Sequence, residues 1–260
     1  MKIQVLVSTM NQSDHSLIEK MNIQSDAIIV NQCNKNEVEE FKYKGNKIKF
    51  LSFAEKGVGL SRNNALMRAS ADICLFADDD VKYINNYNDI ISEAFENNLD
   101  ADVIVFNVPS TNLERQEYII PKYKRVRFYN CLRYGTFRIA IRTESIRKEN
   151  INFSLLFGGG AKYSSGEDSL FMMDCIKNNL KIYACPEIIG SVAHNESTWF
   201  KGYTDKYFFD KGVFFAALSK RWGRLLCLLY AMRRYKVFSH EKTLIKACSL
   251  MISGVKTHLK

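Results

Sequence analysis

Through its first half the chain alternates short runs of β-branched and aliphatic residues with segments of helical pattern. The expected elements in order are strand 2–8, helix 13–22, strands 26–31 and 47–53, helix 60–70, strand 72–77, helix 85–97 and strand 102–107. This alternation is typical of an α/β fold, because parallel strands need long crossover connections that are usually helices. We therefore expect a mainly parallel, twisted sheet flanked by helices.

The second half is less regular. A strand is expected over 137–142, a helix over 165–178, and a strand over 182–185 that Pro186 ends. From residue 205 onward the pattern is helical. A chain of 260 residues can bury one substantial core. We expect one α/β domain over 1–204 and a basic, amphipathic helical extension over 205–260.

Three consecutive aspartates, Asp78, Asp79 and Asp80, follow an apolar run that predicts a buried strand. Carboxylates this close repel one another, and a divalent cation is the simplest partner for them. Mg²⁺ and Mn²⁺ prefer such oxygen ligands and usually keep positions open for substrate phosphates. The alternative is that one or two of these acids cap the helix that follows.

Polar residues also follow the first two strands, at 8–11 and 31–34. Ligands of parallel α/β sheets bind outside the carboxyl ends of the strands. These two segments and the aspartates are therefore expected to face one crevice.

Residues 55–65 place two glycines, Lys56 and Arg62 where a loop enters a helix. A helix N-terminus beside two cations suits a diphosphate. The alternative is that the glycines serve a turn and Arg62 lies on a surface helix.

Glu167 and Asp168 stand at the start of another expected helix. Ser165 and Asp168 fit the spacing of a capping box, which is the structural alternative to a catalytic role. The glycines at 158–160 just upstream indicate a turn where backbone approaches a ligand closely.

Taken in order, four motifs resemble those of family-2 glycosyltransferases with the GT-A fold, including small bacterial enzymes that build capsular or lipid-linked surface polysaccharides. The motifs are Val5–Asn11, Gly59–Ala65, Phe76–Val81 and Gly166–Asp168. The resemblance covers about residues 1 to 200, and together the motifs are fairly specific.

This resemblance implies roles for particular residues. Ser8, Thr9 and Asn31 would hold a uracil base, although many members carry Asp where this chain has Asn31. Asp78 and Asp80 would bind ribose and metal, and an alignment shifted by one residue gives Asp79 either role. Lys56 or Arg62 would add positive charge at the diphosphate. His194 would be a further metal ligand, and Trp199 would stack on a sugar. The alternatives are that His194 is a packed or solvated residue and that Trp199 fills the core.

The implied reaction is inverting and depends on Mn²⁺ or Mg²⁺. Asp168, with Glu167 beside it, would take the proton from an acceptor hydroxyl that attacks a nucleotide-diphosphate sugar, a UDP-sugar. The acceptor would be a glycan or a polyprenyl-linked molecule. The Q-x-x-R-W motif of large processive synthases is absent, so chain polymerisation is not expected.

Two other functions share some of these sequence features. A sugar-phosphate nucleotidyltransferase of related fold would also need paired acids, but it normally shows a Gly-rich basic loop near the first strand, and 8–11 has none. A nucleic-acid-binding module is suggested by the basic C-terminus and its aromatic residues. These aromatics lie at helical spacing with leucines, so no nucleic-acid partner is expected.

The charge of the chain is concentrated at its C-terminal end. Residues 201–260 hold 13 Lys/Arg and 3 Asp/Glu, whereas the net charge of the whole chain is +9. Basic amphipathic helices bind anionic membranes, and the alternative is that the leucines pack on the catalytic domain. The seven cysteines form no C-x-x-C pair, and the N-terminus turns polar too soon for a signal peptide. We expect a cytoplasmic protein, and the first of these two alternatives would make it peripheral on the inner face of the plasma membrane.

Overall fold

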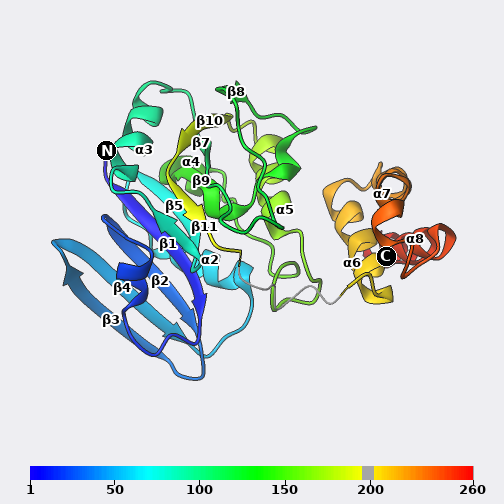
Figure 1. The fold of residues 1–260 in the computed structure, drawn as a ribbon, viewed down its shortest axis with the longest axis horizontal. Coiled ribbons are helices and arrows are strands. Elements are labelled where there is room, and N and C mark those ends of the chain that lie inside the picture. The colour runs from blue at the N-terminus through cyan, green and yellow to red at the C-terminus, as the bar shows by residue number, and fades with distance from the viewer. Residues whose placement is uncertain (195–201, 260) are drawn as a thin grey trace.

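The computed structural model describes residues 1–194 and 202–259. Its strands are β1 (Ile3–Met10), β2 (Asp26–Gln32), β3 (Glu37–Tyr43), β4 (Asn46–Phe53), β5 (Ile73–Asp78), β6 (Val81–Tyr83), β7 (Val103–Asn107), β8 (Lys124–Arg125), β9 (Ile139–Arg142), β10 (Ile182–Ile188) and β11 (Gly190–Val192). Its α-helices are α1 (Leu17–Lys20), α2 (Val58–Arg68), α3 (Tyr87–Glu96), α4 (Thr143–Lys148), α5 (Glu167–Lys177), α6 (Asp205–Leu218), α7 (Gly223–Phe238) and α8 (Leu244–Leu259). Figure 1 shows a sheet with flanking helices and, to one side, the last three helices.

The main sheet has the strand order β3-β4-β2-β1-β5-β9-β7-β10-β8. β4, β2, β1 and β5 pair in parallel, and β7 pairs in parallel with β10. β9 runs antiparallel between β5 and β7, so those two strands point the same way. The carboxyl ends of the parallel strands consequently meet at one edge of the sheet. The expected α/β fold with a mainly parallel sheet is confirmed.

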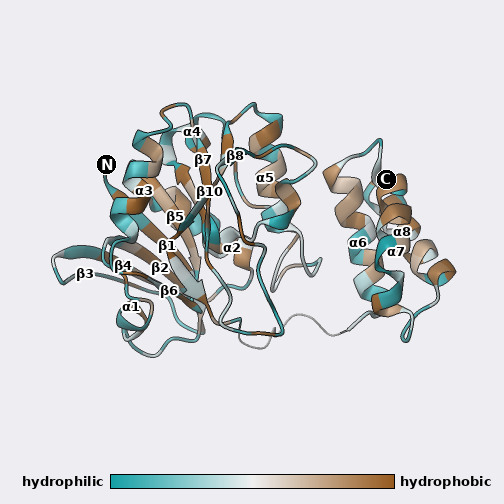
Figure 2. Ribbon diagram, turned by 45° about the horizontal axis from the view of Figure 1, so that its top comes forward, coloured by the Kyte–Doolittle hydropathy of each residue, from teal (hydrophilic) through white to brown (hydrophobic). Residues whose placement is uncertain are grey.

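Apolar side chains fill both faces of the sheet, as a sheet covered on both sides requires. On one face, strand residues such as Val5 and Leu75 pack with Tyr87 and Phe95 of α3. On the other face, residues from α2 and α5, including Phe171, pack on the strands. Figure 2 shows the hydrophobic central strands between these layers.

Several elements differ from the expectation, among them β3, α1 and β10, and β6, β8 and α4 are also additional to it. β3 was not expected, because four of its seven residues are charged and it is an exposed edge strand. α1 covers only Leu17–Lys20 of the expected helix 13–22. β10 continues through Pro186, which lies where the register against β7 shifts between Ala184 and Ile188. Proline is tolerated at such an irregularity because the ladder there does not need its missing N–H.

Helices α6, α7 and α8 form a bundle with its own apolar core, to which Phe157, Tyr163 and Leu170 of the preceding region also belong. The backbones of α6 and α8 touch: a Cβ on Gly212 would lie 1.9 Å from the carbonyl oxygen of Met251. The boundary expected at residue 205 falls at the first residue of α6. The division into two domains stays a prediction. Among the described residues, no helix is long and apolar enough to cross a membrane.

Candidate active site

The polar ends of β1, β2 and β5 lie together at one edge of the sheet, as we expected from the sequence. Ser8 of β1 pairs with Asp78 of β5, and Thr9 pairs with Asn31 of β2. Because all three strands end at the same edge, their last side chains and the loops that follow surround one site. The three aspartates do not cap α3: its N-cap is Asn86, and β6 lies between.

The predicted base-binding residues are held by a network of hydrogen bonds. Thr9 donates from Oγ1 to Oδ2 of Asp79 at 2.5 Å. Asn31 is fully buried, and its side-chain amide both accepts from the backbone N–H of Gln12 and donates to its carbonyl. The hydroxyls of Ser61 and Ser8 are hydrogen-bonded at 3.0 Å. Asn31 thus fixes the loop after β1, and its contact with a base stays a prediction.

Arg62 lies at the centre of the site. Its side chain is only 4% exposed, and its guanidinium donates to Asp78 at 2.9 Å, to Asp168 at 2.9 Å and to Glu167 at 3.1 Å. Three carboxylates around one buried cation hold its pKa above the ordinary value, although burial alone would lower it. In this structure Arg62 links the aspartate cluster to the start of α5. Its predicted contact with a diphosphate remains untested.

Glu167 and Asp168 differ in protonation although they are neighbours. Burial raises the pKa of Glu167, the charge of Asp168 raises it further, and Arg62 offsets this only partly. Burial would also raise the pKa of Asp168, but Arg62 and hydrogen bonds from Glu167 and Thr136 outweigh it and lower the pKa. Asp168 is therefore the ionised member of the pair, which a proton acceptor must be.

The capping-box alternative for Asp168 is not what the structure shows. The N-cap of α5 is Gly166, which has no side chain to cap the helix, and its backbone N–H donates to Glu167 and not to Asp168. Asp168 instead points to Arg62 and to the backbone N–H of Thr136. In the glycine turn upstream, the backbone lies against the side chain of Glu167 and not against open space. A Cβ on Gly158, whose φ is +105°, would lie 2.7 Å from the carboxyl carbon of Glu167.

Asp80 and His194 are brought together by the small two-stranded sheet. β6 follows Asp80 directly and pairs with β11, which ends two residues before His194. The backbone N–H of Ala193 then donates to the carbonyl of Asp80. Burial and the charges of Asp78 and Asp79 raise the pKa of Asp80, whereas nearby His194 lowers it. The structure therefore places two of the predicted metal ligands side by side.

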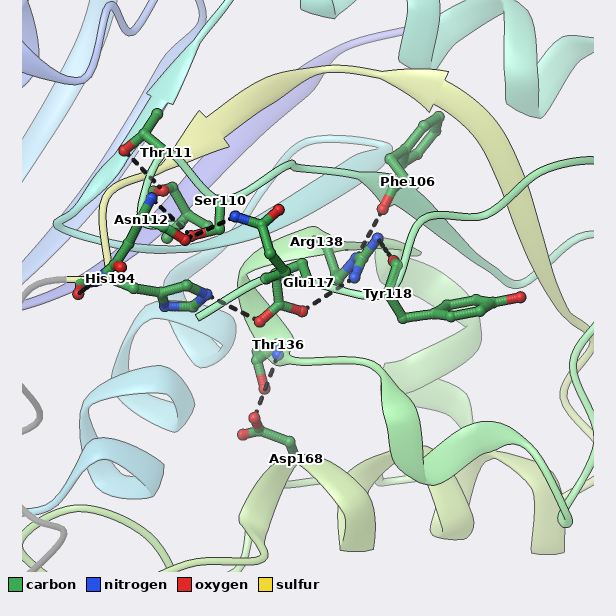
Figure 3. A network of polar contacts seen from close by, with 12 residues as sticks. Phe106, Ser110, Thr111, Asn112, Glu117, Tyr118, Thr136, Arg138, Asp168 and His194 are labelled. Carbon is green, nitrogen blue, oxygen red and sulfur yellow. Dashed lines mark hydrogen bonds and ion pairs between the residues drawn. The ribbon is translucent and has the colours of Figure 1, made fainter. Parts of the chain in front are cut away.

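His194 is held by residues that the sequence analysis did not single out. Its Nε2 lies 2.8 Å from Oε1 of Glu117, whose other oxygen accepts from Arg138 at 3.2 Å. Arg138 is fully buried and also donates to the carbonyls of Phe106 and Tyr118. Figure 3 shows Glu117 between the imidazole and the guanidinium. The only sequence signal was a charged residue inside the apolar run 137–141.

The donor atoms fit a divalent cation. Asp80 carries no ion pair within the described residues, and it shares the cluster with Asp78 and Asp79. No three His, Cys, Asp or Glu side chains of that part of the chain are arranged to hold an ion by themselves. Mg²⁺ and Mn²⁺ are commonly bound by one or two carboxylates together with substrate phosphates. A metal held by Asp78 and Asp80 stays a prediction.

Lys56 and Trp199 were also predicted to contact the donor, and the structure describes only the first of them. The stem of Lys56 packs beside the glycine turn, because a Cβ on Gly160 would lie 3.0 Å from its Cγ. Lys56 is thus close to the N-terminus of α2, as the diphosphate hypothesis requires. Trp199, the predicted sugar-stacking residue, lies outside the described residues.

The whole fold is similar to solved glycosyltransferase structures. Residues 1–349 of S. aureus TarS in complex with UDP-GlcNAc match 98% of this chain with a TM-score of 0.69 and 17% identity, over 82% of that chain. The mannosyltransferase PcManGT from Pyrobaculum calidifontis, in complex with GDP-Man and Mn²⁺, matches 99% of this chain with a TM-score of 0.51 and 11% identity, over 73% of that chain. No protein-family model and no curated protein matches the sequence. These likenesses establish the fold, so the expected GT-A-like fold is confirmed.

The protonation of Glu167 has a measurable consequence. At pH values between 4.5, the ordinary pKa of a Glu carboxyl, and the raised pKa of Glu167, the folded protein keeps a proton on Glu167 that the unfolded chain has lost. The free energy of unfolding therefore falls as pH rises through this interval. Glu167→Gln mimics the protonated carboxyl, so we expect the variant to match the native protein below this interval and to be more stable above it.

Thermal unfolding across a pH series measures this difference. Glu93→Gln, at an exposed position of α3, is the matched control and should leave the pH dependence unchanged. A Glu167→Gln curve that runs parallel to the native curve at every pH would contradict the assignment.

Proposed function

We propose that this protein is an inverting glycosyltransferase that moves a sugar from a nucleotide-diphosphate donor, a UDP-sugar, to a hydroxyl of an acceptor. One observation carries the proposal. Arg62 binds Asp78 of the aspartate cluster and Asp168 of α5 at the same time, so a donor-binding acid and a candidate base lie one guanidinium apart. A direct displacement needs the donor-binding groups and the base close to one site, because nucleophile and leaving group lie on opposite sides of one carbon.

The fold supports the choice of donor. TarS has been solved with UDP-GlcNAc and with UDP, and both structures match nearly the whole of this chain. The ends of β1 and β2, which hold Ser8, Thr9 and Asn31, are the region where the sequence resemblance places the uracil. The amide of Asn31 is hydrogen-bonded to Gln12 and Ser52, so Asn31 would support base binding by fixing the loop after β1.

Asp168 acts as the base. It is ionised, and each of its oxygens has spare acceptor capacity beyond its bond to Arg62 or to the N–H of Thr136. As the acceptor oxygen forms its bond to the anomeric carbon, Asp168 takes the hydroxyl proton and the bond to the diphosphate breaks. Protonated Glu167 keeps a second negative charge away from the base.

Asp78 and Asp80 would hold Mn²⁺ or Mg²⁺ together with the donor phosphates. His194 would have to turn toward Asp80 to become a further ligand, because no three His, Cys, Asp or Glu side chains of the described residues are arranged to hold an ion. When bound, the ion neutralises the negative charge that develops on the leaving diphosphate. Lys56 at the N-terminus of α2 would place a positive charge at the same group. Glu117 and buried Arg138 fix where the His194 imidazole lies.

The acceptor is a glycan or a polyprenyl-linked molecule of surface polysaccharide synthesis, used at the cytoplasmic side of the membrane. Its support is the sequence resemblance together with the basic helical bundle that packs beside α5. The bundle reaches the site directly: a Cβ on Gly166 would lie 2.4 Å from the ring of Phe214 in α6.

Donor binding is expected to depend on the metal. The negative cluster of Asp78, Asp79 and Asp80 repels a diphosphate unless a cation lies between them. Calorimetric titration of UDP-GlcNAc, UDP and GDP-Man, each with Mn²⁺ and with chelator, tests this. We expect UDP compounds to bind at least about tenfold more tightly with Mn²⁺, a difference of about 1.4 kcal/mol.

The variant Asp80→Asn is expected to remove most of this metal effect, while Asp89→Asn, an exposed acid on α3, should keep it. Binding of UDP that is equal with Mn²⁺ and with chelator would remove the metal role. Absence of binding to every nucleotide and nucleotide sugar would contradict the proposed function.

A further inference from the structure

Helix α7 exposes an apolar face where a solvated helix would be polar. Its buried side consists of Gly223, Cys227, Ala231 and Phe238, which pack in the bundle core. The opposite side is apolar as well, and its side chains are between 45 and 51% exposed: Leu225, Leu228, Leu229 and Met232. A helix that is hydrophobic on both sides is normally covered on both sides.

Basic residues border this face. At about 100° per residue, Arg224 lies on one flank of the stripe and Arg233 on the other, while Arg221 and Lys236 lie near its two ends. All four side chains are exposed. Trp222, 51% exposed, stands at the N-terminal end of the helix. The α7 face, meaning Trp222, Leu225, Leu228, Leu229, Met232 and these four cations, therefore combines an apolar stripe with a positive border.

From this combination we infer that the α7 face binds the surface of an anionic lipid bilayer. The charge selects the occupant: residues 201–260 carry 13 Lys/Arg against 3 Asp/Glu, so a second copy of the same positive face would be repelled and anionic headgroups attracted. Leucine, methionine and tryptophan at this spacing are the side chains that enter the headgroup boundary of a membrane. Arg224 and Arg233 reach headgroup phosphates from either side.

Among the described residues, the contacts that hold the bundle lie on the other side of α7. α7 packs on α6 and α8 through its buried residues, and α6 in turn contacts the catalytic region at Gly166. A membrane bound at α7 would therefore hold the bundle, and the active site beside it, at the lipid surface. The site resides on α5 and the strand ends, so lipid binding itself needs neither donor nor metal.

Flotation of the full-length protein with vesicles tests the inference. We expect binding to vesicles of phosphatidylcholine with about one third phosphatidylglycerol at low salt, and little binding to pure phosphatidylcholine or at high salt. The triple variant Leu225→Gln, Leu229→Gln, Met232→Gln should lower the partition coefficient about 100-fold. Replacing Arg221, Arg224 and Arg233 by Gln should lower it about fivefold per charge removed.

Met67→Gln with Leu99→Gln is the matched control, since both residues are exposed and apolar but lie outside the bundle. In a Trp199→Phe background, the fluorescence of Trp222 should be quenched by lipids brominated in their acyl chains. Three outcomes would overturn the inference: no flotation with anionic vesicles at low salt, flotation that the leucine variants leave unchanged, or a dimer in solution that these variants dissociate while vesicle binding is absent.

Discussion

Asp168→Asn is expected to lower turnover about a thousandfold while the affinity for the donor nucleotide changes little. General-base catalysis by a positioned side chain contributes about 10²–10⁴ in rate, and an amide cannot accept the proton. The loss should appear in kcat and not in the KM of the donor, because Asp168 acts on the acceptor hydroxyl. The measurement is sugar transfer, or hydrolysis of the donor sugar, per folded molecule.

The stability of this variant should fall only modestly. Asp168 accepts from Arg62 with one oxygen and from the N–H of Thr136 with the other, so an amide must turn its NH₂ group toward one of these two donors. An unmade buried hydrogen bond costs about 1–3 kcal/mol. Asp174→Asn is the matched control, because Asp174 lies on the same helix and its one ion pair within residues 1–194 and 202–259 is with exposed Lys177. A variant with native activity per folded molecule would show that Asp168 has a structural role alone.

The sequence predicted the parts of the site that lie in short stretches at the ends of strands. Asp78, Asp79 and Asp80 follow an apolar run, and the rule for parallel sheets places them beside Thr9. Strand order was not needed for this step, because every parallel strand ends at the same edge. The fold class could be predicted for a similar reason, since alternation of strands and helices is a local pattern.

The rest of the site depends on contacts between distant segments. Glu117, Arg138 and His194 come from three separate regions, and they meet only because β11 pairs with β6 and β9 lies between β5 and β7. No spacing in the sequence reports such pairings. Arg62 shows the same difference: its motif indicated a cation near phosphate, but its burial among three carboxylates follows from how the folded chain brings α2, the end of β5 and the start of α5 together.

Arg62→Met is expected to be the most destabilising change in the site. It would leave Asp78, Asp168 and Glu167 without their shared cation, and removing one partner of a buried ion pair costs about 3–5 kcal/mol. Urea denaturation measures this loss. Arg68→Met, an exposed position on the same helix, is the matched control. Arg62→Lys should fall between the two, since an ammonium group keeps the charge but lacks the planar fork.

The loss of stability in Arg62→Met should also depend on pH, and the pKa values of the carboxylates determine its direction. Without Arg62 the buried acids Glu167 and Asp168 have raised pKa values, so the folded state keeps protons that the unfolded state has released. The free energy of unfolding of Arg62→Met therefore falls as pH rises, and the gap to the native protein narrows as pH is lowered toward about 4. Adding Glu167→Gln and Asp168→Asn to Arg62→Met should recover part of the lost stability, because the charges left unpaired are then gone. A gap that stays constant with pH, with no recovery in the triple variant, would mean that Arg62 acts through packing on Phe153 and not through its ion pairs.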